Sequence, residues 1–168
     1  MTREGEGPLL VVRIANSSAE RRLPRALIRE ALDRAYRARR RKPAAMDLAV
    51  LDDDAIRRLN RRHLFRDRAT DVLAFDDGEE EQDGRLRLGD VAISAGTARR
   101  EAAARGVPFR NELIFYALHG LLHLMGMRDD DDEGRRRMHL AQAKTLGELG
   151  LKTDDSFPGD ALARPDGE

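Results

Sequence analysis

Two histidines separated by three residues, His119 and His123, are the side chains in this sequence best suited to chemistry. Side chains four positions apart lie on one face of a helix, so both imidazoles can approach one divalent cation. Gly126 follows, and a glycine there predicts that the helix ends in a left-handed turn. Asp129 is then placed to offer a carboxylate as a third ligand. Such a set leaves one position for water, which predicts a catalytic site for one Zn²⁺ ion.

The residue after the first histidine bears on the reaction class. Zinc peptidases of the His-Glu-x-x-His type carry a glutamate there as general base, whereas this chain has Gly120. The longer spacing His-x-x-x-His-x-x-Gly-x-x-Asp still matches the ligand spacing of the metzincin peptidases, with aspartate in the last place. A metalloprotease-like zinc hydrolase is therefore an alternative, but the missing base disfavours peptide hydrolysis.

The segment around the histidines is apolar on most of its circumference, which predicts a central, buried helix that begins at Pro108 or Asn111. Histidines on a buried helix need polar partners, and a metal is one such partner. Glu112 lies seven residues before His119 on the same face, about 10 Å along the axis. It can support the metal ligands from behind, or it can stabilise the helix dipole as an acidic residue at the helix start.

The segments that must position this helix alternate between strand-like and helix-like patterns. Strands are predicted at 9–15, 46–51, 70–75 and 86–94, and helices at 26–40, from Asp52 or Asp53 through Leu59, and from Ser94 to about Arg105. A last amphipathic helix follows the acidic run 130–133, with an apolar face of Met138, Leu140, Ala141, Leu146 and Leu149. This order predicts an α+β fold in which a small mixed four-stranded sheet packs with about five helices. Residues 1–152 are expected to form one domain and 153–168 a disordered C-terminal tail.

Composition limits the function classes. A chain of 168 residues suits a single domain. Its 31 basic and 31 acidic residues give no global field that would attract a polyanion, so local clusters must supply any such preference. The absence of cysteine excludes disulfides and thiolate zinc sites. No signal peptide and no membrane span are apparent, so we expect a soluble, cytoplasmic protein with no membrane partner.

A basic segment, 60–75, leads from a helix end through a loop into the third predicted strand. Arginine offers a planar fork that matches phosphate oxygens, so Arg62, Arg66 and Arg68 are candidates for phosphate binding. A solvated loop is the alternative. Further along, residues 88–94 read Leu-Gly-Asp-Val-Ala-Ile-Ser, in which Gly89 predicts a close approach of another backbone and Asp90 is either structural or a support for the site.

Taken in this order, the three segments resemble the YbeY family of bacterial endoribonucleases, the rRNA maturation factors. The family pattern has Thr-Asp-Val-Leu-Ser-Phe, Leu-Gly-Asp-(apolar)3-Ser and His-Gly-x-Leu-His-Leu-x-Gly-Tyr-Asp-His, and this chain matches it at 70–75, 88–94 and 119–126. The resemblance spans about residues 11–149. It implies a zinc ion on the helix and single-strand-specific RNA cleavage in 16S rRNA 3′-end maturation and ribosome quality control. The implied partners are single-stranded rRNA and the small ribosomal subunit with its associated proteins. A non-catalytic ribosome-assembly factor, in which zinc only holds the fold, stays open.

Two departures from the family pattern matter for the site. Met127-Arg128-Asp129 stands where the family has Tyr-Asp-His, so the third histidine falls on Asp129. Carboxylate oxygen is an acceptable zinc ligand. An anionic third ligand makes water at the metal less acidic, however, and predicts a higher pH optimum or weaker turnover. His139, in the next helix, is the rival third ligand. Leu64 replaces an arginine that many members carry, and Arg62, Arg66 or Arg68 could substitute for it.

Overall fold

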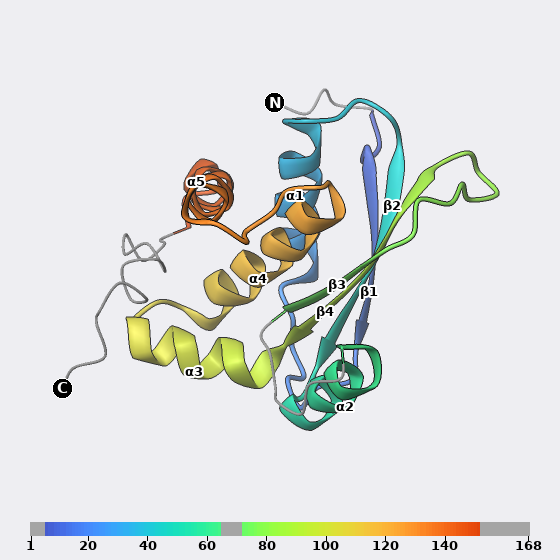
Figure 1. The fold of residues 1–168 in the computed structure, drawn as a ribbon. Coiled ribbons are helices and arrows are strands. Elements are labelled where there is room, and N and C mark those ends of the chain that lie inside the picture. The colour runs from blue at the N-terminus through green and yellow to red at the C-terminus, as the bar shows by residue number, and fades with distance from the viewer. Residues whose placement is uncertain (1–5, 65–71, 152–168) are drawn as a thin grey trace.

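Four strands form one mixed sheet in the order β1-β2-β4-β3. The computed structural model describes residues 6–64 and 72–151, and Figure 1 shows their arrangement. β1 (Leu10–Asn16), β2 (Ala44–Leu51) and β4 (Leu86–Ser94) run parallel, whereas β3 (Val72–Asp76) pairs antiparallel with β4 at the edge. The helices in this part of the chain are α1 (Arg25–Arg37), α2 (Asp53–Leu64), α3 (Ala95–Arg105), α4 (Phe109–Leu124) and α5 (Asp132–Glu148). The predicted α+β fold is confirmed, while the predicted tail, 153–168, lies outside the described residues.

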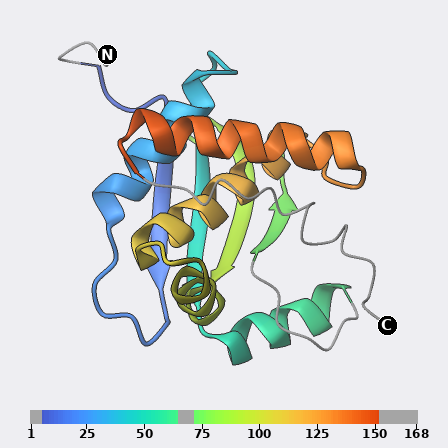
Figure 2. The ribbon, with the colours of Figure 1, turned by 90° about the vertical axis from the view of Figure 1, so that its left-hand side faces the viewer.

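Helices cover one face of the sheet in two layers. α1 and α4 pack directly on the strands, and α5 crosses over both of them (Figures 1 and 2). β2 is a nearly continuous run of apolar residues, as expected of a parallel strand that is covered along its length. α2 lies on the other face, where Ile56 packs with Leu73 and Ala92 in a small second cluster. The main core therefore lies between the sheet and α1 and α4, and α4 is the central helix that its composition predicts.

α3 spans the range that the sequence predicts, and local caps fix its two ends. Ser94 is the N-cap, and its hydroxyl accepts a hydrogen bond of 3.1 Å from the Thr97 amide. Gly106 ends the helix in the left-handed conformation, with φ of 68°. Gly89 also behaves as predicted: a Cβ there would overlap the carbonyl oxygen of Phe75 on the neighbouring strand. No helix in the described ranges is long and apolar enough to cross a membrane.

The prediction for the apolar face of α5 is wrong at one residue. Leu140 is 60% exposed. The buried positions of this helix are Gly134, Met138, Gln142, Thr145 and Leu146, which follow the spacing of one helix face. Leu140 lies two positions from Met138, about 200° around the helix axis, and so points away from α4. Gln142 takes the buried place because its amide donates a hydrogen bond of 2.9 Å to the Phe115 carbonyl.

Candidate metal centre and its cleft

His119 and His123, in the last turns of α4, converge with Asp129 of the loop that follows. The two imidazole Nε2 atoms are 3.0 Å apart, and Asp129 Oδ2 lies 3.3 Å from His119 Nε2 and 3.4 Å from His123 Nε2. In a tetrahedral zinc site with bonds of about 2.0–2.2 Å, neighbouring ligand atoms are about 3.3–3.5 Å apart. The three donor atoms therefore match one face of a zinc tetrahedron, and the residues present fit the ion.

The turn that brings Asp129 back to the histidines is a Schellman motif. Gly126 has φ of 90°, the Met127 amide donates to the Leu122 carbonyl, and the Gly126 amide donates to the His123 carbonyl, both at 3.0 Å. This is the turn that the glycine predicts. Because it satisfies the last carbonyls of α4 inside the chain, the helix can end directly beside the site.

The loop that carries Asp129 is held from the following helix. Asp131 is the N-cap of α5, and its carboxylate accepts a hydrogen bond of 2.6 Å from the Gly134 amide. Arg135, in the first turns of α5, donates from Nη1 to the Asp129 carbonyl at 3.1 Å. α5 therefore fixes the backbone of the third candidate ligand.

The Asp129 carboxyl is held in its ionised form. The hydrogen bond from His119 lowers its pKa to about 2, and the two nearby imidazoles contribute in the same direction against the opposing effect of burial. The side chain is 39% exposed, and each imidazole is 29% exposed. An ionised, partly accessible oxygen beside two imidazoles is the donor set that a borderline-soft divalent cation takes.

Gly120 has a packing role that sequence reasoning missed. A Cβ at this position would lie 2.9 Å from Val91 Cγ2 and closer still to Val91 Cγ1, whereas carbon atoms normally pack at about 3.5–4.0 Å. α4 and β4 thus approach as closely as they do because residue 120 has no side chain. A glutamate, the base of the zinc peptidases, cannot occupy this position unless the helix moves off the sheet or the Val91 side chain is displaced.

The structure brings Asp129, and not His139, to the two histidines. Within the described residues, His119, His123 and Asp129 form a group whose ligand atoms all lie within 4.8 Å of one another, and His139 does not belong to it. The His139 ring instead packs edge-on against Phe115, with ring centroids 5.8 Å apart.

The remaining candidate residues lie away from this group. Glu112 is in the first turn of α4, is 4% exposed and accepts a hydrogen bond of 3.1 Å from Arg105, which favours the helix-start role. Arg62 is exposed on α2, while Arg66 and Arg68 lie outside the described residues. Asp90 pairs with Arg87, at 2.8 Å.

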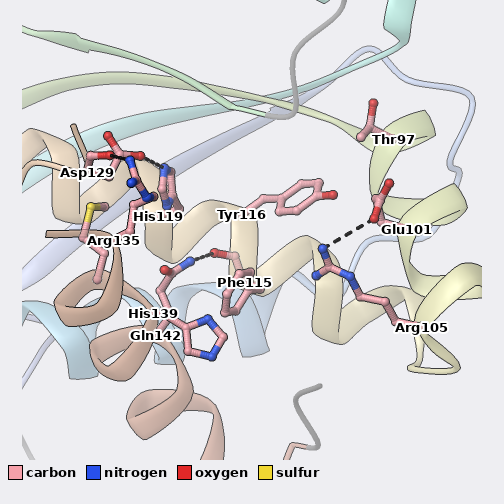
Figure 3. A pocket seen from close by; sticks show the side chains of 11 residues that line it. Thr97, Glu101, Arg105, Phe115, Tyr116, His119, Asp129, Arg135, His139 and Gln142 are labelled. Carbon is pink, nitrogen blue, oxygen red and sulfur yellow. Dashed lines mark hydrogen bonds and ion pairs between the residues drawn. The ribbon is translucent and has the colours of Figure 1, made fainter. Parts of the chain in front are cut away.

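A cleft of about 370 Å³ opens beside the metal candidates (Figure 3). His119 and Asp129 lie at one end of it, and Thr97, Glu101 and Arg105 of the α3 side lie at the other. The wall between the two ends is largely apolar, with Phe115, Tyr116 and Met138. Sequence reasoning did not find the contributions of α3 and α5, because nothing in a linear pattern shows which residues of separate helices face one cavity.

Comparison with known proteins gives a consistent result. The family model described as Endoribonuclease YbeY matches residues 13–150. Proteins named Endoribonuclease YbeY include one from Myxococcus xanthus, 42% identical over 71% of this chain and 41% of its own length. Another, from Rhodopseudomonas palustris, is 38% identical over 82% of this chain and 72% of its own length. The solution structure of TM1509 from Thermotoga maritima superposes with a TM-score of 0.56 at 20% identity, covering 94% of this chain and 99% of that one, and supports the fold.

Proposed function

Because the chain belongs to the YbeY family, we propose that it is a single-strand-specific, zinc-dependent endoribonuclease that acts in the cytoplasm. Its role is in 16S rRNA 3′-end maturation and ribosome quality control, with single-stranded rRNA and the small ribosomal subunit and its associated proteins as partners. The observation that carries this proposal is the triangle of donor atoms from His119, His123 and Asp129, two of which line one end of the cleft.

The mechanism assigns distinct tasks to the residues of this chain. His119, His123 and Asp129 hold the metal, and Zn²⁺ bound there supplies Lewis acidity at the scissile phosphate and acidifies water. Arg62, Arg66 and Arg68 of the basic segment bind the RNA backbone, which makes affinity depend on salt. The cleft beside His119, of about 370 Å³, suits an unpaired nucleotide, which supports the proposed preference for single strands.

The two alternatives make different demands on the site. A peptidase of this ligand spacing needs a base where Gly120 packs against Val91, so peptide hydrolysis is disfavoured by geometry as well as by sequence. A non-catalytic assembly factor needs zinc only to hold the fold. Such a site is normally closed by four protein ligands, whereas here three donors meet and each is partly exposed.

The test combines metal analysis with cleavage assays on the full chain. We expect wild type to bind one Zn²⁺ and to cut a single-stranded rRNA fragment but neither the matching duplex nor casein. Asp129→Ala should lose zinc and cleavage, and Asp129→His should retain both. Stoichiometric zinc of unchanged affinity in Asp129→Ala would remove Asp129 from the site. Cleavage that persists in the His119→Ala/His123→Ala double variant would identify a contaminating nuclease and favour the assembly factor.

The charge of the third ligand gives a second test. Asp129→His replaces an anionic ligand with a neutral one, which makes water at the site more acidic. We expect the pH profile of RNA cleavage by this variant to move to lower pH than that of wild type. Superimposable profiles would contradict the role given to Asp129.

A further inference from the structure

Three arginines from separate elements meet in a groove of about 420 Å³ next to the metal-binding loop. Arg39 follows α1, Arg128 directly precedes the candidate ligand Asp129, and Arg137 belongs to α5. The rest of the lining consists of Gly126, Met127, Asp130 and Asp131. The groove thus lies on the same loop as the candidate metal ligands but is lined by a different set of side chains from the cleft.

The guanidinium groups of this groove have no carboxylate partner in the part of the chain that the structure describes. Several other arginines are paired with carboxylates: Arg13 and Arg87 both pair with Asp47, for example, at 2.9 and 2.8 Å. Among the described residues, no ion pair within 4.0 Å joins Arg39, Arg128 or Arg137 to an acidic group. Three cations gathered in one concavity repel one another, and an anionic ligand relieves that repulsion.

The acidic residues in the lining do not cancel this charge. Asp130 and Asp131 place two carboxylates in the lining against three guanidiniums, so the groove keeps one net positive charge. Arg128 is the residue that makes the net charge of the lining positive. It stands where the YbeY pattern has the aspartate of Tyr-Asp-His, and an aspartate there would leave two guanidiniums against three carboxylates. The basic groove is therefore a property of this chain's own sequence.

The groove lies beside the end of α4, the helix that carries the candidate histidine ligands. Arg40, beside Arg39, donates from Nη2 to the Met125 carbonyl at 3.1 Å and so fixes the end of α1 to the end of α4. α2, which carries Arg62, lies at the opposite end of the sheet from this end of α1 in both ribbon views (Figures 1 and 2). A strand that runs from the α2 end across His119 and His123 would reach the groove after passing the metal.

We propose that Arg39, Arg128 and Arg137 form a phosphate-binding groove that holds the RNA backbone on the far side of the cleavage site from α2. The ligand is a run of phosphates in a flexible single strand, because a flexible backbone can adjust to three arginines that come from separate elements. This assignment rests on the proposed function, since it takes RNA as the substrate.

The test is the salt dependence of RNA binding by metal-loaded protein. Each phosphate contact to a single strand contributes about −0.7 to the slope of log K against log[salt]. Removing three contacts in Arg39→Ala/Arg128→Ala/Arg137→Ala should make the slope less negative by about 2 and lower the affinity at 0.1 M salt by up to about 100-fold. Fluorescence anisotropy with a labelled single-stranded RNA, read before measurable cleavage, reports both quantities, and metal analysis checks that the loop still holds zinc.

A charge-matched control separates local contacts from net charge. Arg21→Ala/Arg22→Ala/Arg110→Ala removes three exposed arginines outside the groove and should change the slope by much less. Equal salt-dependence slopes for the two triple variants would refute the phosphate-binding role of the groove. A groove variant whose slope equals that of wild type would refute it as well. Arg128→Asp, a single change, should weaken binding if the triple variant does not fold. If wild type binds RNA with the expected salt dependence but does not cleave it, the proposed nuclease function is refuted and the phosphate-binding groove is supported.

Discussion

Replacing Gly120 with alanine tests how tightly α4 is fitted to the sheet. The new methyl group would lie 2.9 Å from Val91 Cγ2 and nearer to Val91 Cγ1, both on the central strand β4. Val91 is 1% exposed, so its side chain has no solvent to move into. Either the helix moves off the strand or the valine leaves its preferred rotamer, and both displace the helix that carries His119 and His123.

Two opposing effects set the size of the change in stability. Alanine is favoured over glycine inside a helix by about 0.8–1.0 kcal/mol. Overpacking a well-packed core costs about 1–3 kcal/mol, and a contact this far inside the normal separation belongs at the upper end of that range. We therefore expect Gly120→Ala to lower the free energy of unfolding by about 1–2 kcal/mol.

A double-mutant cycle with Val91→Ala isolates the contact. Val91→Ala removes both γ-methyls and should cost roughly 2 kcal/mol by itself through lost burial and the cavity left behind. The alanine methyl at position 120 then enters the vacated space, so the double variant should be more stable than the sum of the single changes by about 1–2 kcal/mol. Urea unfolding of the four proteins without metal measures these values. A Gly120→Ala protein more stable than wild type, or additive changes, would refute the close-approach argument.

Three further predictions concern side chains whose hydrogen bonds stabilise the fold or the metal-binding loop. Hydrogen bonds from Arg100, Ser94 and Thr97 lower the pKa of Asp53. The ionised carboxylate therefore stabilises the fold above the unfolded-state pKa of about 4, and this contribution is lost as pH falls through the folded-state pKa. Asp53→Asn should be less stable than wild type at pH 7, and the difference between their urea midpoints should shrink below about pH 4; a constant difference would contradict this. Asp131→Ala should cost about 1 kcal/mol in thermal unfolding and Asp131→Asn much less, because asparagine can still cap α5; equal losses would exclude capping. Arg135→Ala should weaken zinc binding about 10-fold in a chelator competition, because the Asp129 carbonyl loses its hydrogen bond from Arg135. Unchanged zinc affinity would show that the loop keeps its conformation without this hydrogen bond.

Local features of the fold could be predicted from the sequence because short-range chemistry determines them. The cap at Ser94 and the left-handed glycines at 106 and 126 follow from which residues tolerate those backbone conformations. The candidate ligands on α4 follow in the same way, since helix periodicity alone brings His119 and His123 together.

Features that depend on distant segments could not be predicted. Nothing in the strand segments shows that β4 lies between β2 and β3. The exposure of Leu140 depends on where α4 lies relative to α5, and hydrophobicity alone suggested the opposite. Gly120 illustrates the limit best: its neighbour Val91 belongs to another element, so the sequence revealed a missing catalytic base and not the reason why no side chain fits there.

All three candidate ligands come from one short segment, 119–129, which has a consequence for the thermodynamics of the protein. An unfolded chain keeps these residues within a few positions of one another and retains a weak site for the cation. Ligand binding stabilises a fold only by the difference between its affinities for the folded and unfolded states. Added zinc should therefore raise the melting temperature at first and then level off at a value set by the ratio of the two dissociation constants. A site built from distant segments would show no such ceiling, because its unfolded chain would offer the cation no site.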